Sequence, residues 1–100
     1  LRIVPIERVV PTELEAIKMA AAELAAEKIF EGQSFRVTVE KRFTEIHSKD
    51  IIEAAVGDIT AKVDLHNPDW IIQIEVLGSL TGVSVIKPSD VLAVVKEKML

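Results

Sequence analysis

The chain has 100 residues, 49% hydrophobic and 28% charged, which is typical of one folded domain rather than a disordered tail. It contains no cysteine, which excludes disulfides, thiolate catalysis and cysteine-based zinc sites and is compatible with a cytoplasmic protein. The formal net charge of −4 disfavours a nucleic-acid partner unless the cations gather locally, and no apolar run is long enough to span a membrane.

The first segment, residues 1–10, is expected to be extended because two prolines keep the residues before them out of a helix. A helix is predicted to follow Thr12, whose side chain would cap it in a T-x-x-E box with Glu15. Gly32 would end this helix. Its buried side would consist of residues at helical spacing, namely Leu14, Ile17, Ala21 and Leu24.

A strand is predicted over residues 34–42, where Phe35, Val37 and Val39 alternate with polar residues. A second helix would begin at Ser48 as its cap, with Asp50 in the first turn. Its apolar side would comprise Ile51, Ile52, Ala55, Val56 and Ile59. Gly57 is interpreted as a point of close contact between this helix and the sheet.

The second half of the chain is expected to be mostly strands. A very short strand at 62–65 precedes a longer one at 70–77, whose second face carries Ile71 and Leu77 and would be partly covered. Residues 78–82, with glycines at both ends, would form a hairpin loop leading to a strand at 83–87. Ser89 would cap a terminal helix over 89–99.

The order of these elements predicts an α/β (α+β) fold. The strand-helix-strand unit should make parallel neighbours by a right-handed crossover, and the last two strands should form an antiparallel hairpin. The result is a small mixed sheet covered by helices. We expect one domain over 1–100 with a core over 5–88, and, since the chain begins at Leu1 rather than Met, a piece of a longer protein.

Few residues suggest catalysis. His47 and His66 lack the serine or carboxylate spacing of a nucleophile and its base, and one histidine beside Asp69 is too few ligands for zinc. No phosphate-binding glycine motif occurs. The sequence therefore predicts no catalytic residue, no metal and no cofactor. In the stretch HNPD, Pro68 would interrupt strand pairing while Asn67 and Asp69 bond their own backbone in a turn.

The sequence resembles a THUMP domain. The resemblance is carried by VDLHNPDW, by RVTVEKRFTEIHSKDII before it and by IQIEVLGSLTGVSVIK after it, and it covers roughly residues 5 to 88. The matching features are a strand ending in Lys-Arg, Ser-Lys-Asp opening a helix, V-D-L-x-N-P-D and a strand pair. The opening segment IVPIERVVPTELEAI is most similar to the adaptor of tRNA cytidine N4-acetylation.

The resemblance implies a non-catalytic RNA-binding domain that holds tRNA, in the family its acceptor region, while another domain or protein modifies it. It implies tRNA and a tRNA-modifying, acetyltransferase-like enzyme as partners, and a cytoplasmic location with no membrane. The family usually carries a preceding domain, and we expect that this chain begins too late to include it.

The candidate RNA-binding residues surround the end of the first long strand and the start of the second helix. They are Arg36, Lys41, Arg42, Lys49 and Lys87, with Lys62 as an extension. Free backbone donors at the helix start suit a phosphate, although Asp50 opposes one. Such contacts would read phosphates and shape rather than bases.

Two alternatives remain open from the sequence. Net acidity favours a protein–protein docking module of a tRNA-modification complex with little RNA contact. A small enzyme domain is the other alternative, although no candidate nucleophile or base has an orienting partner. The sequence does not indicate which modification is involved or the oligomeric state.

Overall fold

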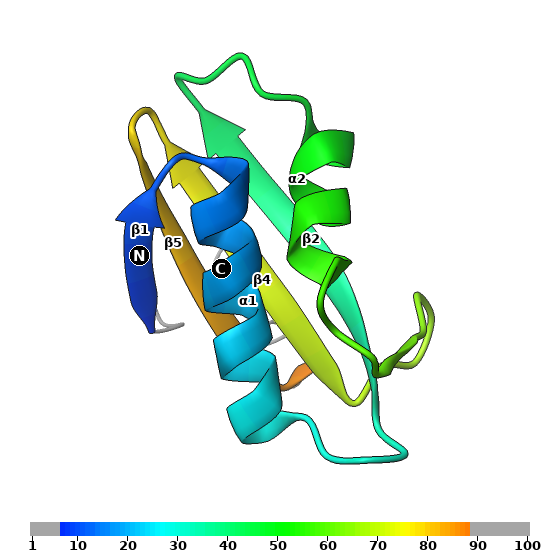
Figure 1. Cartoon of the computed structure of the whole chain (residues 1–100). Coiled ribbons are helices and arrows are strands. Elements are labelled where there is room, and N and C mark those ends of the chain that lie inside the picture. Colours follow the sequence, from blue (N-terminus) through cyan, green and yellow to red (C-terminus); the bar gives the residue numbers. More distant parts are fainter. Residues whose placement is uncertain (1–6, 89–100) are drawn as a thin grey trace, which may run out of the picture.

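The computed structural model describes residues 7–88, in which two helices and five strands follow the order β-α-β-α-β-β-β (Figure 1). The helices are α1 (Leu14–Lys28) and α2 (Ser48–Val56). The strands are β1 (Arg8–Pro11), β2 (Ser34–Arg42), β3 (Lys62–Val63), β4 (Trp70–Leu77) and β5 (Leu80–Ile86). The strands predicted at 34–42 and 70–77 thus have the bounds that their sequence patterns indicated.

The five strands form one mixed sheet in the order β1-β5-β4-β2-β3. Strand β2 is parallel to both β3 and β4, so that Phe35 lies opposite Val63 on one side and Trp70 on the other. Strands β4 and β5 form an antiparallel hairpin, and β1 pairs antiparallel with β5. Both helices lie against the same face of the sheet (Figure 1). The predicted mixed sheet, with parallel neighbours and a final hairpin, is confirmed.

The core lies between this sheet face and the two helices. In β4 the alternate residues Ile72, Ile74 and Val76 are buried, which explains why a half-apolar strand forms there. Burying one such side chain contributes about 1.5–3 kcal/mol relative to leaving it exposed. The other buried members of the cluster are Ile17, Ala20, Ala21, Leu24, Phe35, Ile51, Ala55, Val83 and Val85.

The start of α1 differs from the predicted capping box. Its N-cap residue is Glu13, and no side-chain hydrogen bond caps the helix. The hydroxyl of Thr12 lies 2.9 Å from that of Thr81, which is fully buried on β5. A buried hydroxyl needs a hydrogen-bond partner, so Thr12 joins the start of the helix to the sheet instead of capping it.

The predicted stripe and end of α1 also need correction. Leu14 is 40% exposed and lines a surface groove between α1 and α2, whereas the other three predicted stripe residues are buried. The helix ends at Lys28 with Ile29 as its C-cap. Gly32 lies in the turn that follows, with a φ of +87° that favours glycine.

Helix α2 begins one residue before the predicted start. Ser48 is already helical, the N-cap residue is His47, and no side chain caps the helix. Ile52 was predicted to lie on the apolar side of this helix, but it is exposed. Gly57 is the C-cap, and a Cβ added to it would lie 3.4 Å from Cε of Lys18, so its close neighbour is α1 and not the sheet.

The hairpin between β4 and β5 is tighter than predicted. Its turn contains only Gly78 and Ser79, and Gly78 has a φ of +60°. Gly82 is not part of the turn, because it lies within β5 opposite Val9. Strand β1 was expected only to be extended, yet it forms the edge of the sheet by pairing with β5.

The sheet face turned away from the helices is partly covered, as Ile71 indicated. Ile71 and Ile86 pair across β4 and β5 and are both buried, whereas Leu77 and Leu80 at the other end of the hairpin are exposed. The terminal helix predicted over 89–99 lies outside the described residues. Within residues 7–88, neither helix has the length and apolar character that crossing a membrane requires.

Candidate nucleic-acid interface

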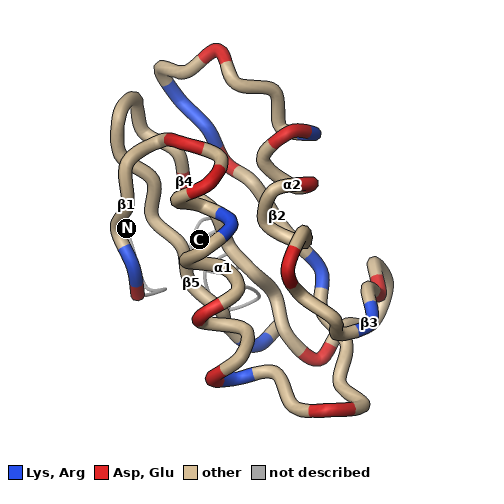
Figure 2. The backbone as a smooth tube through the Cα atoms, in the orientation of Figure 1, with Lys and Arg blue, Asp and Glu red and all other residues tan. Residues whose placement is uncertain are grey.

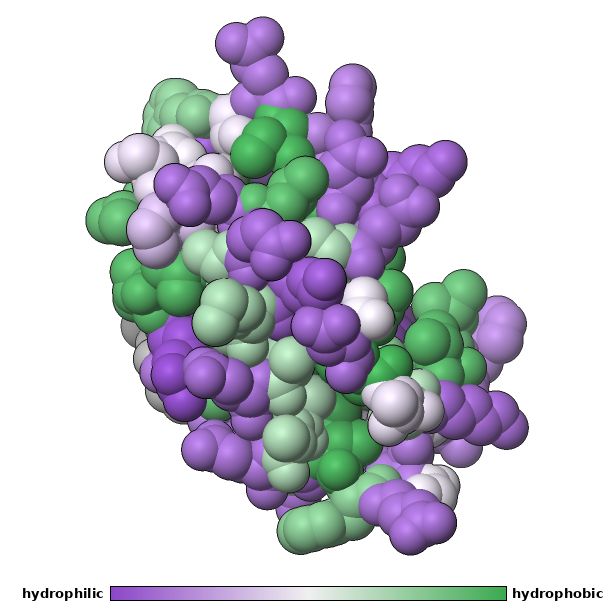
Figure 3. Space-filling view, in the orientation of Figure 1, coloured by the Kyte–Doolittle hydropathy of each residue, from purple (hydrophilic) through white to green (hydrophobic). Residues whose placement is uncertain are grey.

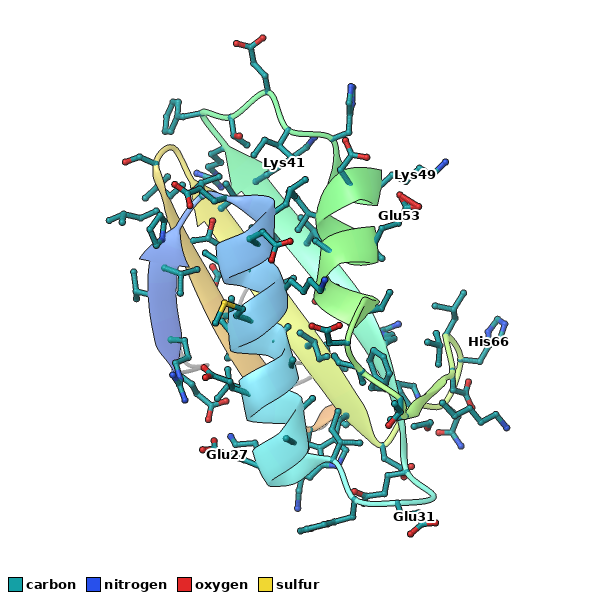
Figure 4. The ribbon with its side chains drawn as sticks, in the orientation of Figure 1. Glu27, Glu31, Lys41, Lys49, Glu53 and His66 are labelled. Atoms are coloured by element: carbon teal, nitrogen blue, oxygen red, sulfur yellow. The ribbon has the colours of Figure 1, made fainter. Side chains whose placement is uncertain are left out.

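Three of the five predicted basic residues gather where β2 ends and α2 begins. Lys41 and Arg42 are the last residues of β2, Lys49 is the second residue of α2, and all three are exposed. Figure 4 shows Lys41 and Lys49 at the same end of the molecule. Residues 43–47 form the loop between them. We call Lys41, Arg42 and Lys49 the β2–α2 cation cluster.

Local hydrogen bonds hold this loop in place. The Nζ of Lys41 donates to the backbone carbonyl of Ile46 at 2.9 Å, and Oγ1 of Thr44 accepts from the Ile46 N–H at 3.3 Å. The carbonyl of Arg42 accepts from the Gly78 N–H at 2.9 Å, which fixes the end of β2 against the turn between β4 and β5. The cations therefore project from an anchored backbone.

The other two predicted residues, Arg36 and Lys87, lie toward the opposite end of the sheet. Arg36 precedes Arg42 by about 20 Å along β2, given a rise of about 3.3 Å per residue. It lies opposite Ile71, whose partner Ile86 immediately precedes Lys87. The sequence left open whether the five cations share one contiguous patch, and the strand register does not bring all five together.

At that opposite end the cations have contacts of their own. The Nζ of Lys87 lies 5.7 Å from the centroid of the Trp70 ring, within the range of a cation–π interaction. The indole of Trp70 donates to Oε1 of Gln33 at 2.9 Å. Arg36 donates from Nη1 to the carbonyl of Leu65 at 3.5 Å, and its Nε is buried without a partner among the described residues. These contacts lie away from the β2–α2 cation cluster, and an RNA-binding role for Arg36 and Lys87 stays a prediction.

The charges of the described residues are distributed unevenly (Figure 2). Ion pairs hold the cations of β1 and α1: Arg8 with Glu23, Lys18 with Asp58 and Lys28 with Glu7. By contrast, within residues 7–88 no carboxylate lies at ion-pair distance from Lys41, Arg42 or Lys49. Because their charges are not neutralised by such partners, these three remain able to contact a polyanion.

The groove between α1 and α2 is acidic. It has a volume of about 330 Å³, and its charged lining consists of Glu15, Asp50 and Glu53 against Lys18. In Figure 4, Glu53 lies on α2 below Lys49. Such a surface is unfavourable for phosphates.

Two carboxylates explain the turn between β3 and β4. Oδ1 of Asp64 accepts from the N–H groups of His66 and Asn67, both at 3.0 Å. The hydrogen bond from Asn67, followed by that from His66, holds the pKa of Asp64 below its ordinary value. Oδ2 of Asp69 accepts from the Ser34 N–H at 2.8 Å. The turn is confirmed, but Asp64 forms it, while Asp69 binds β2 instead of its own backbone.

Both histidines are exposed, at separate places in the part of the chain that the structure describes. His47 is exposed before α2, and His66 points away from the body of the molecule (Figure 4). Within residues 7–88, no three His, Cys, Asp or Glu side chains gather closely enough to hold a metal ion.

One notable residue of this surface was not among the predicted site residues. Phe43 follows Arg42 directly, is 85% exposed and has a φ of +57°, which is rare for a bulky side chain. The available signal was an aromatic residue directly after Lys-Arg at a strand end. Sequence alone did not show whether the ring would be buried.

The fold and this surface define a small mixed-sheet domain with a cationic sheet end beside an acidic helical layer. The chain belongs to the THUMP domain family, whose sequence profile matches residues 11–86. The predicted family is therefore confirmed. A sequence comparison with curated proteins gave no match.

Several solved structures are similar to this fold. PH1313 from Pyrococcus horikoshii OT3 has a TM-score of 0.63 and 27% identity, over 80% of this chain and 30% of PH1313. The THUMP domain of THUMP domain-containing protein 1 has a TM-score of 0.64 and 23% identity, over 76% of this chain and 88% of that one. A 4-thiouridine synthetase, solved with RNA and ATP, has a TM-score of 0.62 and 22% identity, over 80% of this chain and 24% of the synthetase. The chain thus spans less than a third of PH1313 and of the synthetase.

Proposed function

We propose that this chain is a non-catalytic RNA-binding domain that positions tRNA for modification by a separate catalytic domain or protein. The observation that carries the proposal is the β2–α2 cation cluster, whose members have no carboxylate partner within residues 7–88. The similarity to a 4-thiouridine synthetase solved in complex with RNA supports RNA as the ligand.

The cluster would act on the phosphate backbone. Three cations around one short loop would contact neighbouring phosphates, while the acidic groove between the helices would keep the strand off that face. Contacts of this kind give affinity and orientation without reading the base sequence. A domain that binds in this way suits many tRNAs and leaves the choice of nucleotide to the catalytic unit.

Within this function, we propose an adaptor in tRNA cytidine N4-acetylation that acts with an acetyltransferase-like enzyme in the cytoplasm. The support is the opening segment IVPIERVVPTELEAI, which resembles that of the acetylation adaptor. Co-purification with tRNA cytidine acetyltransferase activity from the native source would test this role, and co-purification with a different tRNA-modifying enzyme would contradict it.

Charge reversal at the cluster tests RNA binding directly. In gel shifts with tRNA at several salt concentrations, Arg42→Glu should weaken binding about tenfold or more and lower the salt slope by about one. Lys62→Glu is the matched control, because Lys62 is an exposed cation on β3, at the other end of β2, and the change in net charge is the same. The control should bind nearly as well as wild type.

Two outcomes would contradict the proposal. Equal losses for Arg42→Glu and Lys62→Glu would mean that net charge, rather than the cluster, determines affinity. Absence of tRNA binding at every salt concentration, in the whole protein as well as in this chain, would exclude an RNA-binding role altogether.

A second candidate is a protein–protein docking module with little RNA contact. Figure 3 shows hydrophobic side chains along the margin where β1 and the turn between β4 and β5 lie. Val9, Leu77 and Leu80 are exposed there. Cross-linking in a reconstituted modification complex separates the two functions: RNA cross-links at residues 41–49 would reject the docking module, and protein cross-links alone would favour it.

A further inference from the structure

Phe43 combines two features that are unfavourable for an isolated domain. Its side chain is 85% exposed, the largest exposure among the large hydrophobic residues of the described chain. Its φ of +57° lies in the left-handed region, and it is the only residue other than glycine to do so within residues 7–88. Exposure of an aromatic ring forgoes burial, and this backbone conformation is strained for a bulky residue. A strained backbone conformation of this kind is typical of a residue whose position has a function.

The surrounding backbone fixes where Phe43 lies. The hydrogen bond from the Gly78 N–H to the Arg42 carbonyl, at 2.9 Å, holds the preceding residue against the hairpin turn. A Cβ added to Gly78 would meet Cβ of Phe43 at 3.9 Å, so the aromatic residue lies directly beside this turn. On its other side, the contact between Lys41 and Ile46 braces the loop. Phe43 is therefore presented at a defined point and does not hang from a loose segment.

Three cations flank the loop that holds Phe43, and Glu45 is the one carboxylate within that loop. Lys41 and Arg42 precede it and Lys49 lies at the far end of its loop, and none of the three has a carboxylate at ion-pair distance within residues 7–88. An exposed aromatic ring with cations on both sides matches the two parts of a nucleotide, since bases stack on aromatic rings and cations hold the flanking phosphates.

We propose that Phe43 stacks on an unpaired base of the bound RNA, while the β2–α2 cation cluster holds the phosphates on either side of it. This inference rests on the proposed function and makes it more specific. The domain would prefer RNA that has single-stranded nucleotides next to a helix over RNA that is fully double-stranded. The preference would not depend on which base is present, because every base has a stacking face.

The test compares two RNA ligands and four protein variants. The ligands are a blunt RNA duplex and the same duplex with a short single-stranded 3′ overhang, each measured by fluorescence anisotropy. Phe43→Ala removes the ring, Phe43→Leu keeps apolar bulk without an aromatic face, and Phe43→Trp keeps the aromatic face. Phe30→Ala is the matched control. Phe30 is also exposed, but it lies between the end of α1 and the start of β2, whereas Phe43 follows the end of β2.

For the overhang ligand, Phe43→Ala and Phe43→Leu should lose between about 5-fold and 100-fold in affinity, as removal of one stacking ring typically does. Phe43→Trp and Phe30→Ala should bind like wild type. For the blunt duplex all variants should bind equally. A 2-aminopurine base in the overhang should be quenched by wild type and not by Phe43→Ala.

The results distinguish the stacking role of Phe43 from the proposed RNA-binding function. If wild type binds RNA but Phe43→Ala binds the overhang ligand equally well, the stacking role is wrong while RNA binding stands. If Phe43→Leu retains full affinity, apolar contact rather than stacking is involved and the inference is also wrong. If Phe43→Ala binds RNA normally but loses a modification enzyme, the ring is a protein contact. If no variant, wild type included, binds either ligand, both proposals fail.

Discussion

Asp69 shows how one side chain can align two distant segments. Its Oδ2 accepts hydrogen bonds from the backbone N–H and the hydroxyl of Ser34, at 2.8 Å and 3.3 Å. The backbone of Asp69 in turn donates to the Ser34 carbonyl at 3.1 Å. Because Ser34 opens β2 and Asp69 immediately precedes β4, these bonds set the start of the parallel pairing.

We therefore expect Asp69→Ala to lower the free energy of unfolding by about 1–3 kcal/mol, because the buried Ser34 N–H loses its acceptor. Asp69→Asn keeps an oxygen at the same position and should lose less. Urea denaturation of the three proteins measures the difference. If the alanine and asparagine variants are equally stable, the hydrogen bond to Ser34 does not carry this stability.

At the residue scale, sequence identified the right segment but not the right atoms. Pro68 and its neighbours indicated a turn, because their backbone preferences are local. The acceptor that forms the turn is Asp64, and the partner of Asp69 is 35 residues away. Local spacing carries no information about a partner so distant in the chain, so these hydrogen bonds could be found only in the folded structure.

The contact between Thr12 and Thr81 couples the start of α1 to β5. Thr81 is fully buried, and its hydroxyl lies 2.9 Å from that of Thr12. Because Glu13 is the N-cap and no side chain caps α1, Thr12 stabilises the junction between helix and sheet rather than the helix itself.

A double-mutant cycle distinguishes this role from capping. Thr12→Ala and Thr81→Val should each destabilise the fold, and the double variant should be more stable than the sum predicts, with a coupling of about 0.5–1.5 kcal/mol in unfolding experiments. If Thr12 capped the helix, the effect of Thr12→Ala would be the same whether or not Thr81 carried a hydroxyl. Additive effects would thus contradict the contact.

At the element scale, the periodicity of apolar residues predicted the strands that bury one face. It did not predict the features that depend on contacts with another element. Strands β2 and β4 were predicted with their observed bounds, since alternation of apolar residues directly reflects one buried face. Three features were not predicted, because each depends on contacts with β5: the cap of α1, the length of the hairpin turn and the pairing of β1. Gly82 illustrates the limit, since its residue type indicated a turn while its register places it within a strand.

Across the whole molecule, the strands of the sheet differ in how fully they are paired with their neighbours. Strand β4 lies at the centre between β5 and β2, and it is paired along its full length, whereas β3 contacts the sheet through two residues only. Regions with few buried apolar contacts open at low free energy, and central strands open with the whole fold.

Native-state hydrogen exchange should reveal this hierarchy. Amides of β4 should exchange most slowly, at the rate set by global unfolding, and those of β3 should exchange fastest among the strands. The residues of β1 and β2 should fall between these limits. Protection in β3 equal to that in β4 would contradict the expected order.

The candidate site was predictable only as a region. The segment from Lys41 to Lys49 was predicted because all its cations lie within one short stretch of sequence, on either side of a loop. Arg36 and Lys87 depend on the register of β2 with β4 and of β4 with β5, which sets them at the other end of the sheet. Sequence did not show that Phe43 would be exposed, since its exposure and left-handed backbone arise from its place beside Gly78.

The short length of β3 leaves part of the sheet border open to pairing with another molecule. Beyond Phe35, the outer side of β2 has no strand neighbour within residues 7–88, and such an open border can template cross-molecule β-pairing. Glu40, Lys41 and Arg42 place successive charges along it, a known protection against fibril-like stacking. Replacing Arg42 with an apolar residue would weaken that protection, so a glutamate substitution, which retains a charge, keeps lost RNA affinity from being confused with aggregation.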